Sequence, residues 1–200
     1  MPIIITVAHA ICVDSVERDC DRRAAQAAQV LYRILQAKKC EVYLRVAGNY
    51  RDHIDANRTG ARSTLWRRQL RTLIREQLKL GPVFVLDVHS FPAEADMVGH
   101  LKAYMIEMWF RSKLGGKEKV YQGWSANDKA WAQLALKESL GEGGTKIMLG
   151  DRTNDIMITS NIIGASTAIL ELNEAKTILS DEELETLMIH LTDELLMKYC

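Results

Sequence analysis

The sequence predicts an α/β protein: a single domain, residues 1–200, in which a mostly parallel or mixed sheet carries helices on both faces. Two observations lead to this prediction. Short apolar runs alternate with longer segments of helical periodicity, which is typical of strand–helix units. Some of these runs are apolar throughout, as in strands that are covered on both faces. A content of 48% hydrophobic and 26% charged residues is ordinary for a globular chain.

The N-terminal half predicts the clearest elements. An unbroken apolar run opens the chain as a buried strand, and the segment after it places apolar side chains on one helical face. Gly81-Pro82 ends a second helical segment, because proline cannot continue a helix. The predicted elements are a strand over 3–8, a helix over 21–37, a strand over 41–47, a helix over 63–79 and a strand over 83–88.

The C-terminal half alternates in the same way. Two of its helices begin with a serine followed three residues later by an acidic residue, the spacing of a capping box: Ser125 with Asp128, and Ser180 with Glu183. The predicted elements are a strand over 104–109, a turn at Gly115-Gly116, a helix over 126–140, a strand over 166–172 and a last helix. No repeat, low-complexity tract or linker divides the chain.

Charge excludes some classes of partner. The 26 basic and 26 acidic residues cancel, so the chain as a whole does not attract nucleic acid or an anionic membrane. No apolar run reaches the roughly 18 residues of a membrane span, and no basic stretch opens a signal peptide. We interpret a local arginine cluster as a solvated helix face, the alternative being a patch for a polyanion. Its members are Arg58, Arg62, Arg67, Arg68, Arg71 and Arg75.

The four cysteines, Cys12, Cys20, Cys40 and Cys200, show no CxxC spacing. We interpret them as reduced thiols of a cytoplasmic protein. Cys12 and Cys20 lie close to the first candidate site, so a thiolate metal ligand stays open as an alternative.

Polar side chains follow three of the predicted strands where each strand ends. His9 follows the first strand, Asp55-Ala56-Asn57-Arg58 follows the second, and Asp87-Val88-His89-Ser90 ends the most apolar one. In an open α/β sheet, ligands bind at this edge. These strings are therefore the first candidates for a functional site.

Histidines and carboxylates at one sheet edge indicate a metal site serving hydrolysis. A catalytic zinc usually has three protein ligands and a water, whose pKa it lowers to about 7. His9 and His89 are the histidine candidates, and Asp87 leaves its strand on the same face as His89, where it can hold that imidazole. The carboxylate ligand stays open among Glu17, Asp19 and Asp21, one of which caps the following helix in the simplest interpretation.

Two further elements complete the candidate site. Glu171 is a charge inside an apolar run, where burial without a partner is costly, so it faces either solvent or a cation. We favour the site, with Glu174 as the second choice. Arg58 presents a planar fork that fits a carboxylate, and Asn57 beside it adds a donor.

Together these residues resemble the N-formylglutamate amidohydrolases, distant relatives of the zinc carboxypeptidases and aspartoacylase. The resemblance implies a zinc carboxypeptidase-like fold and one Zn²⁺ per chain, held by His9, Asp21 and His89. It also implies that Glu171 is the catalytic base and that Arg58 acts on the substrate. Asp55, Asn57 and Ser90 are then substrate contacts. The segment 93–165 carries none of the matching residues.

The function predicted from these residues is a zinc-dependent amide hydrolase acting on a small substrate with a free carboxylate, an N-acyl amino acid or a peptide C-terminus. Its alternative is a non-catalytic metal-binding or assembly protein that keeps the fold. A phosphate-directed enzyme or nucleic-acid binder is disfavoured, because no glycine-rich phosphate loop is present. The donor set leaves another divalent ion open, and substrate and oligomeric state are not determined.

Overall fold

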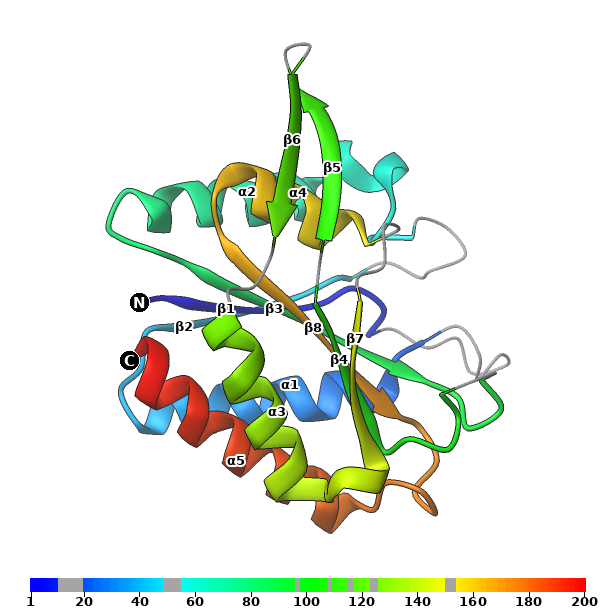
Figure 1. Ribbon diagram of the computed structural model, residues 1–200. Helices are drawn as coiled ribbons and strands as arrows, with labels where there is room; N and C mark the ends of the chain where they lie inside the picture. Colours follow the sequence, from blue (N-terminus) through cyan, green and yellow to red (C-terminus); the bar gives the residue numbers. More distant parts are fainter. Residues whose placement is uncertain are drawn as a thin grey trace.

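The computed structural model describes residues 1–10, 20–48, 55–95, 98–107, 109–114, 117–122, 126–149 and 154–200. At its centre is a six-stranded sheet of order β2-β1-β3-β8-β4-β7 (Figure 1). Its strands are β1 (Ile3–Val7), β2 (Val42–Val46), β3 (Phe84–Phe91), β4 (Ala103–Glu107), β7 (Thr145–Leu149) and β8 (Ser166–Asn173). β2, β1, β3 and β8 are parallel, whereas β4 runs antiparallel to β8. The sheet is therefore mixed, and the predicted fold class is confirmed.

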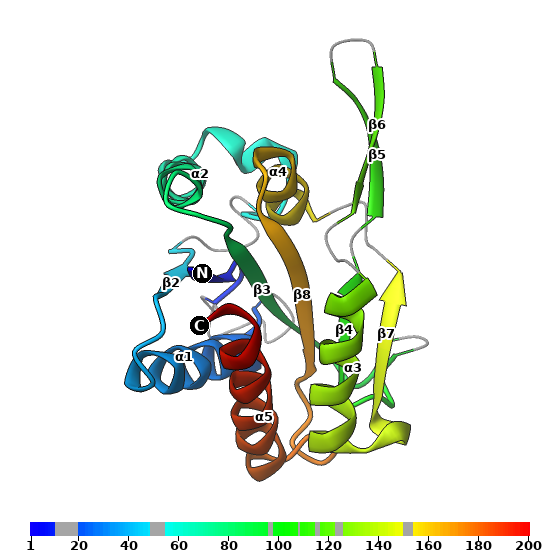
Figure 2. The ribbon, with the colours of Figure 1, turned by 60° about the vertical axis from the view of Figure 1, so that its left-hand side comes forward.

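Helices cover both faces of the sheet, as Figures 1 and 2 show. One layer holds α1 (Arg22–Ala37), α3 (Ala126–Leu140) and α5 (Asp181–Tyr199); the other holds α2 (Leu65–Leu78) and α4 (Asp155–Ile163). Ile3 and Ile5 pack with the first layer, and Ile4 packs with the second. Because successive side chains of a strand point to opposite faces, this two-sided burial explains why β1 is apolar throughout.

Local signals fix the ends of two helices. At the start of α5, the Ser180 side chain accepts from the Glu183 backbone and the Glu183 side chain accepts from the Ser180 backbone, which confirms that capping box. Gly164 ends α4 with a φ of 117°, a left-handed conformation that glycine adopts without strain.

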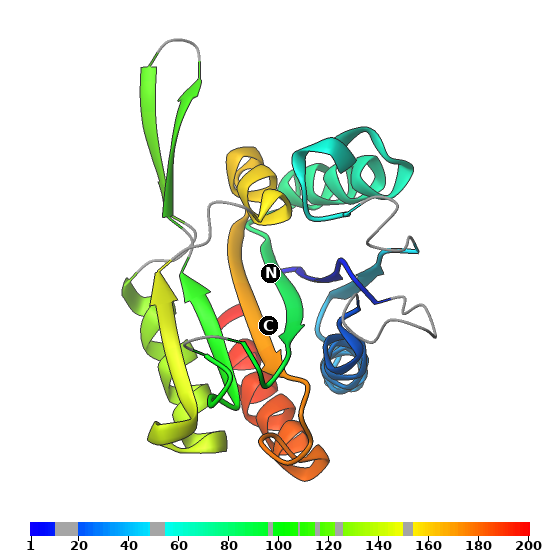
Figure 3. The same cartoon turned by 90° about the vertical axis from the view of Figure 1, so that its right-hand side faces the viewer.

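The middle of the chain departs from the prediction. The strand predicted over 104–109 is divided between β4 in the sheet and β5 (Trp109–Leu114), which pairs with β6 (Lys117–Gln122) in a separate hairpin. This hairpin stands away from the sheet (Figure 3). β6, β7 and α4 were not predicted, because each is short and mixes polar with apolar residues. The predicted turn at Gly115-Gly116 and the cap at Ser125 lie outside the described residues.

The prediction of reduced thiols is wrong for three of the cysteines. Cys20 is disulfide-bonded. Cys40 and Cys200 are oxidised as well. They form a disulfide, with Cα atoms 5.4 Å apart, that joins the end of α5 to the loop before β2. The sequence separation of 160 residues hides this pairing, since only the packing of α5 brings the two together. The cytoplasmic location, which rested on reduced thiols, stays a prediction. Among the described residues, no helix is long and apolar enough to cross a membrane.

Candidate metal centre

Three side chains meet at the carboxyl ends of the parallel strands. Ligand atoms of His9, Asp21 and His89 all lie within 4.8 Å of one another, and all three side chains are buried. Oδ2 of Asp21 lies 3.3 Å from His9 Nδ1 and 2.8 Å from His89 Nδ1. The structure thus brings together the three residues that the resemblance implied as ligands.

The fold places each of the three. β1 and β3 are adjacent parallel strands, so His9 and His89 reach the same edge of the sheet. Asp21 occupies the N-cap position of α1, but its side chain makes no capping hydrogen bond. Its backbone N–H donates to the His9 carbonyl over 2.7 Å, which fixes the two residues relative to each other. The Asp21 carboxylate is therefore turned to the histidines and not to the helix. Glu17 and Asp19, the other candidate carboxylates, lie outside the described residues.

A second carboxylate contacts the Nε2 atom of each imidazole. Nε2 of His9 lies 2.8 Å from Asp55 Oδ1, and Nε2 of His89 lies 2.7 Å from Asp87 Oδ2. When each Nε2–H donates to its carboxylate, both Nδ1 atoms are left for a common centre. Such a carboxylate–histidine arrangement fixes the orientation of metal-binding imidazoles.

The charges of the cluster stabilise one another. Burial alone would raise the pKa of Asp21, but hydrogen bonds with His89 and His9 lower it to about 2. Burial alone would lower the pKa of His89, but the charge of Asp87 and the hydrogen bond with Asp21 raise it well above 6.5. Burial alone would raise the pKa of Asp55, but hydrogen bonds with His9 and the Asn57 backbone, together with the charges of His9 and Arg58, lower it to about 2. The carboxylates are therefore ionised at neutral pH.

A cavity of about 140 Å³ opens beside the cluster. It is lined by His9, Asp21, Asn57, Arg58, His89, Ser90, Asn154, Ile169 and Glu171. Glu171 pairs in register with His89 across β3 and β8, which brings it to the same face as that histidine. Of the residues predicted for the site, only Asp55 is not in the lining, because it lies behind His9.

Three other predicted site residues, Asn57, Arg58 and Ser90, differ in their burial and in their hydrogen-bond partners. Asn57 is buried, and its Oδ1 accepts from the Ile156 backbone over 3.3 Å. The Arg58 side chain is 48% exposed and lines the cavity, and its Nε lies 3.4 Å from Asp55 Oδ2. The Ser90 hydroxyl donates to Glu174, which itself does not line the cavity.

Sequence reasoning missed two residues that hold Asp87. The Thr6 hydroxyl donates to Asp87 Oδ1 over 2.6 Å, and Asn154 Nδ2 donates to Asp87 Oδ2 over 2.9 Å. Asn154 also caps α4, where its Oδ1 accepts from the Met157 backbone. An asparagine before an apolar run is a helix-start signal, so Asn154 was detectable as a cap but not as part of the site.

The arginine cluster is not a uniformly solvated face. Arg67 is completely buried and donates from Nη2 to Asp155 Oδ2 over 2.7 Å and from Nη1 to the Ala56 carbonyl over 2.8 Å. Arg62 also donates to Asp155, over 3.0 Å. The interpretation as a solvated face is wrong for Arg67, because only the packing of α4 against α2 brings Asp155 to it. The alternative interpretation, a polyanion-binding patch, could not include Arg67 either, because Arg67 is buried.

The residues of the cluster fit a divalent cation. Two imidazoles and a carboxylate around one centre, beside a cavity large enough for water, match the donor set of a catalytic zinc site. The thiolate alternative finds no support, since Cys20 is disulfide-bonded and Cys12 lies outside the described residues.

Comparison by sequence finds no match, either to a protein family or to a curated protein. Comparison with solved structures finds similar folds. A gene product of Agrobacterium tumefaciens, Atu2144, aligns with 98% of this chain and 89% of its own, at a TM-score of 0.61 and 13% identity. N-formylglutamate amidohydrolase from Ralstonia eutropha JMP134 aligns with 98% of this chain and 92% of its own, at a TM-score of 0.57 and 14% identity.

Succinylglutamate desuccinylase from Chromobacterium violaceum has a TM-score of 0.55 and 14% identity; the match covers 98% of this chain but only 60% of the desuccinylase. At these identities the comparisons establish the fold, which agrees with the resemblance noted from the sequence. A shared fold can carry different chemistries, so the fold by itself does not determine the function.

Proposed function

We propose that this protein is a metal-dependent amide hydrolase that acts on a small substrate bearing a free carboxylate. The observation that carries the proposal is the convergence of His9 Nδ1, His89 Nδ1 and the Asp21 carboxylate beside a cavity that also contains Glu171 and Arg58. The fold similarity to an amidohydrolase and a desuccinylase supports the same class of reaction.

His9, Asp21 and His89 would hold the cation, with zinc favoured by the donor set. A bound cation supplies a Lewis acid and lowers the pKa of water to about 7. Glu171 takes a proton on its carboxylate from the attacking water and passes it to the leaving nitrogen, so the acyl group leaves as a carboxylic acid and the amine is released. Glu171 lines the cavity, whereas Glu174 does not, so we assign this role to Glu171.

Arg58 and Asn57 bind the substrate. The Arg58 guanidinium pairs with the substrate carboxylate, and its contact with Asp55 aims it. Asn57 lies in the cavity wall, where its side-chain amide is fixed by the start of α4. Asp55 and Asp87 are positioning residues in this proposal, because they touch the imidazoles and not the cavity centre.

The test combines elemental analysis with an activity assay. Purified protein should hold about one divalent transition metal per chain, and it should hydrolyse N-formylglutamate until a chelator removes the metal. His89→Ala should lose both metal and activity. His100→Ala is the matched control, because His100 is exposed and belongs neither to the cluster nor to the cavity lining, and it should change neither.

Two outcomes would contradict the proposal. Metal bound equally by wild type and His89→Ala would place the metal elsewhere. Bound metal without turnover of any N-acyl amino acid or peptide C-terminus would favour the alternative, a non-catalytic metal-binding protein that keeps the fold.

A further inference from the structure

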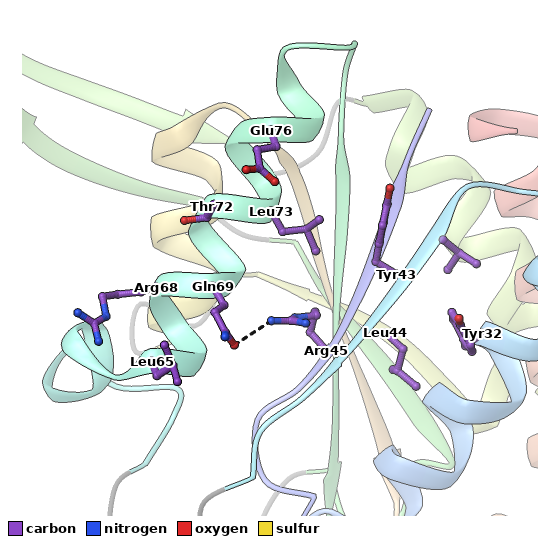
Figure 4. A pocket seen from close by; sticks show the side chains of 11 residues that line it. Tyr32, Tyr43, Leu44, Arg45, Leu65, Arg68, Gln69, Thr72, Leu73 and Glu76 are labelled. Atoms are coloured by element: carbon purple, nitrogen blue, oxygen red, sulfur yellow. Dashed lines mark hydrogen bonds between the residues drawn. The ribbon is translucent and has the colours of Figure 1, made fainter.

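A second groove lies away from the metal centre, along the outer side of an edge strand. β2 is the terminal strand of the sheet and, within the described ranges, pairs only with β1. A groove of about 540 Å³ follows it between α2 and α1, and Figure 4 shows its walls. Tyr32 comes from α1, Tyr43 and Leu44 come from β2, and Leu65 and Leu73 come from α2. None of its lining residues belongs to the metal cavity.

The backbone of β2 directs hydrogen-bonding groups into this groove. The Glu41 carbonyl accepts from Ile3 N–H, and Ala47 N–H donates to the Val7 carbonyl, each over 2.9 Å. Odd-numbered positions of β2 therefore bond to β1. Because the direction of the peptide groups alternates along a strand, Val42, Leu44 and Val46 point theirs outward. An unpaired row of this kind is a template for another strand.

We propose that the groove is occupied by a second copy of this chain, joined through antiparallel pairing of the two β2 strands about a two-fold axis at Leu44. In this register Leu44 meets its own equivalent, and Val42 meets Val46 of the second copy, so all outward groups exchange hydrogen bonds. Tyr43 then lies directly opposite Arg45 of the second copy, at the non-hydrogen-bonded position between two hydrogen-bonded pairs, where side chains are closest. A cation over an aromatic ring is a favourable cross-strand contact.

Helix α2 crosses the same axis, and two contacts show where. Arg45 Nη2 donates to Gln69 Oε1 over 3.2 Å, as Figure 4 shows, and Gln77 Nε2 donates to the Tyr43 hydroxyl over 2.8 Å. α2 therefore runs antiparallel to β2, and Leu44 lies opposite the segment midway between Gln69 and Gln77. The exposed Thr72 lies in that segment. A two-fold axis at Leu44 thus brings the two α2 helices together near Thr72.

The charges on α2 are complementary about this point. Arg68 and Glu76 are exposed, line the groove and lie four residues on either side of Thr72. In an antiparallel pair of α2 helices centred at Thr72, Arg68 of each copy faces Glu76 of the other. Within the described part of the chain, neither residue has an ion pair of its own.

The same dimer covers apolar surface. Leu65 is 62% exposed at the mouth of the groove, and Val46 is 39% exposed on the edge strand. Strand pairing, opposite charges and apolar surface therefore all agree with one occupant. Such an interface is isologous, as in most homodimers.

Sedimentation equilibrium of the whole protein, from about 1 to 100 μM, tests the proposal. Wild type should dimerise. Leu44→Pro removes the outward N–H and keeps the bonds to β1, so it should give a monomer with unchanged circular dichroism. Arg68→Glu and Glu76→Arg should each raise the dimer Kd about 10-fold or more, because like charges then face each other twice.

The double variant Arg68→Glu/Glu76→Arg restores opposite charges and should recover the wild-type Kd to within about 3-fold. Arg75→Glu is the matched control, since it makes the same charge change on an exposed position outside the groove. A monomeric wild type would overturn the proposal. So would a dimer that Leu44→Pro and the single charge reversals leave intact, or one that the double variant fails to restore.

Discussion

Two charge clusters lie at the same edge of the sheet, and they differ in what their side chains face. Asp155 is enclosed by Arg62 and Arg67, and Arg67 also bonds to the Ala56 carbonyl. His9, Asp21 and His89 instead turn their ligand atoms toward one point beside a cavity. The charges of the first, closed cluster pair with one another, and this holds the loop around Ala56 and the start of α4 in place. The ligand atoms of the second cluster converge beside open space, which is the arrangement of a ligand-binding site.

Cavity volume alone does not make this distinction. The groove beside β2 is about 540 Å³ and the metal cavity about 140 Å³. Only the smaller one brings buried titratable groups with strongly shifted pKa values to a common point. Such groups are characteristic of functional sites.

The largest expected effect tests the converging cluster. Glu171→Gln keeps the shape of the side chain but removes the proton acceptor, so turnover of an N-acyl amino acid should fall roughly 10²–10⁴-fold. Metal content, measured by elemental analysis, should stay unchanged.

Glu174→Gln is the control for this variant, because Glu174 bonds to Ser90 and to the Arg23 backbone. It should reduce turnover far less. A stronger loss in Glu174→Gln than in Glu171→Gln would move the catalytic base to Glu174.

The second prediction tests the closed cluster. Arg67→Met keeps much of the side-chain volume but leaves Asp155 and the Ala56 carbonyl without a buried donor. The free energy of unfolding in urea should fall by about 3 kcal/mol, while metal content per folded chain is retained. Arg75→Met, on an exposed turn of α2, should cost little. Loss of metal in folded Arg67→Met would show that the two clusters are not separable.

The third prediction concerns substrate recognition. Arg58→Lys keeps the charge but loses the planar fork. Wild type should hydrolyse N-formylglutamate faster than its α-carboxamide. In the variant the ratio of the two rates should fall roughly 10–100-fold, because hydrogen bonds to a charged group are lost. The control variant Arg75→Lys should keep the wild-type preference for the carboxylate substrate. Equal hydrolysis of both substrates by wild type would mean that Arg58 does not bind the carboxylate.

The smallest effect is a pH dependence of the closed cluster. Burial would raise the pKa of Asp155, but hydrogen bonds with Arg62 and Arg67 lower it below 3.8. Asp155 is therefore more acidic folded than unfolded, and its contribution is present above about pH 4 and lost as the pH falls through the folded pKa. The Tm difference between wild type and Asp155→Asn should shrink over that acidic range. A difference that is constant with pH would contradict this ion pairing.

The sequence by itself predicted the elements whose local pattern is strong. The strand predicted over 3–8 is β1 (Ile3–Val7), and the one predicted over 166–172 is β8 (Ser166–Asn173). Both are buried on two faces, so their apolar runs reflect the layers directly. Polar residues after such strands also located His9 and His89, because parallel strands end at one edge of the sheet.

Tertiary structure alone decided contacts between distant segments. It turned Asp21 from a helix cap to the histidines, brought Asn154 to Asp87, and buried Arg67 against Asp155. It also joined Cys40 to Cys200. Periodicity and capping signals act over a few residues and can be read along the chain. Which carboxylate meets which cation, and which strand edge stays open for a partner, depends on how the helices pack on the sheet, and no local pattern encodes that.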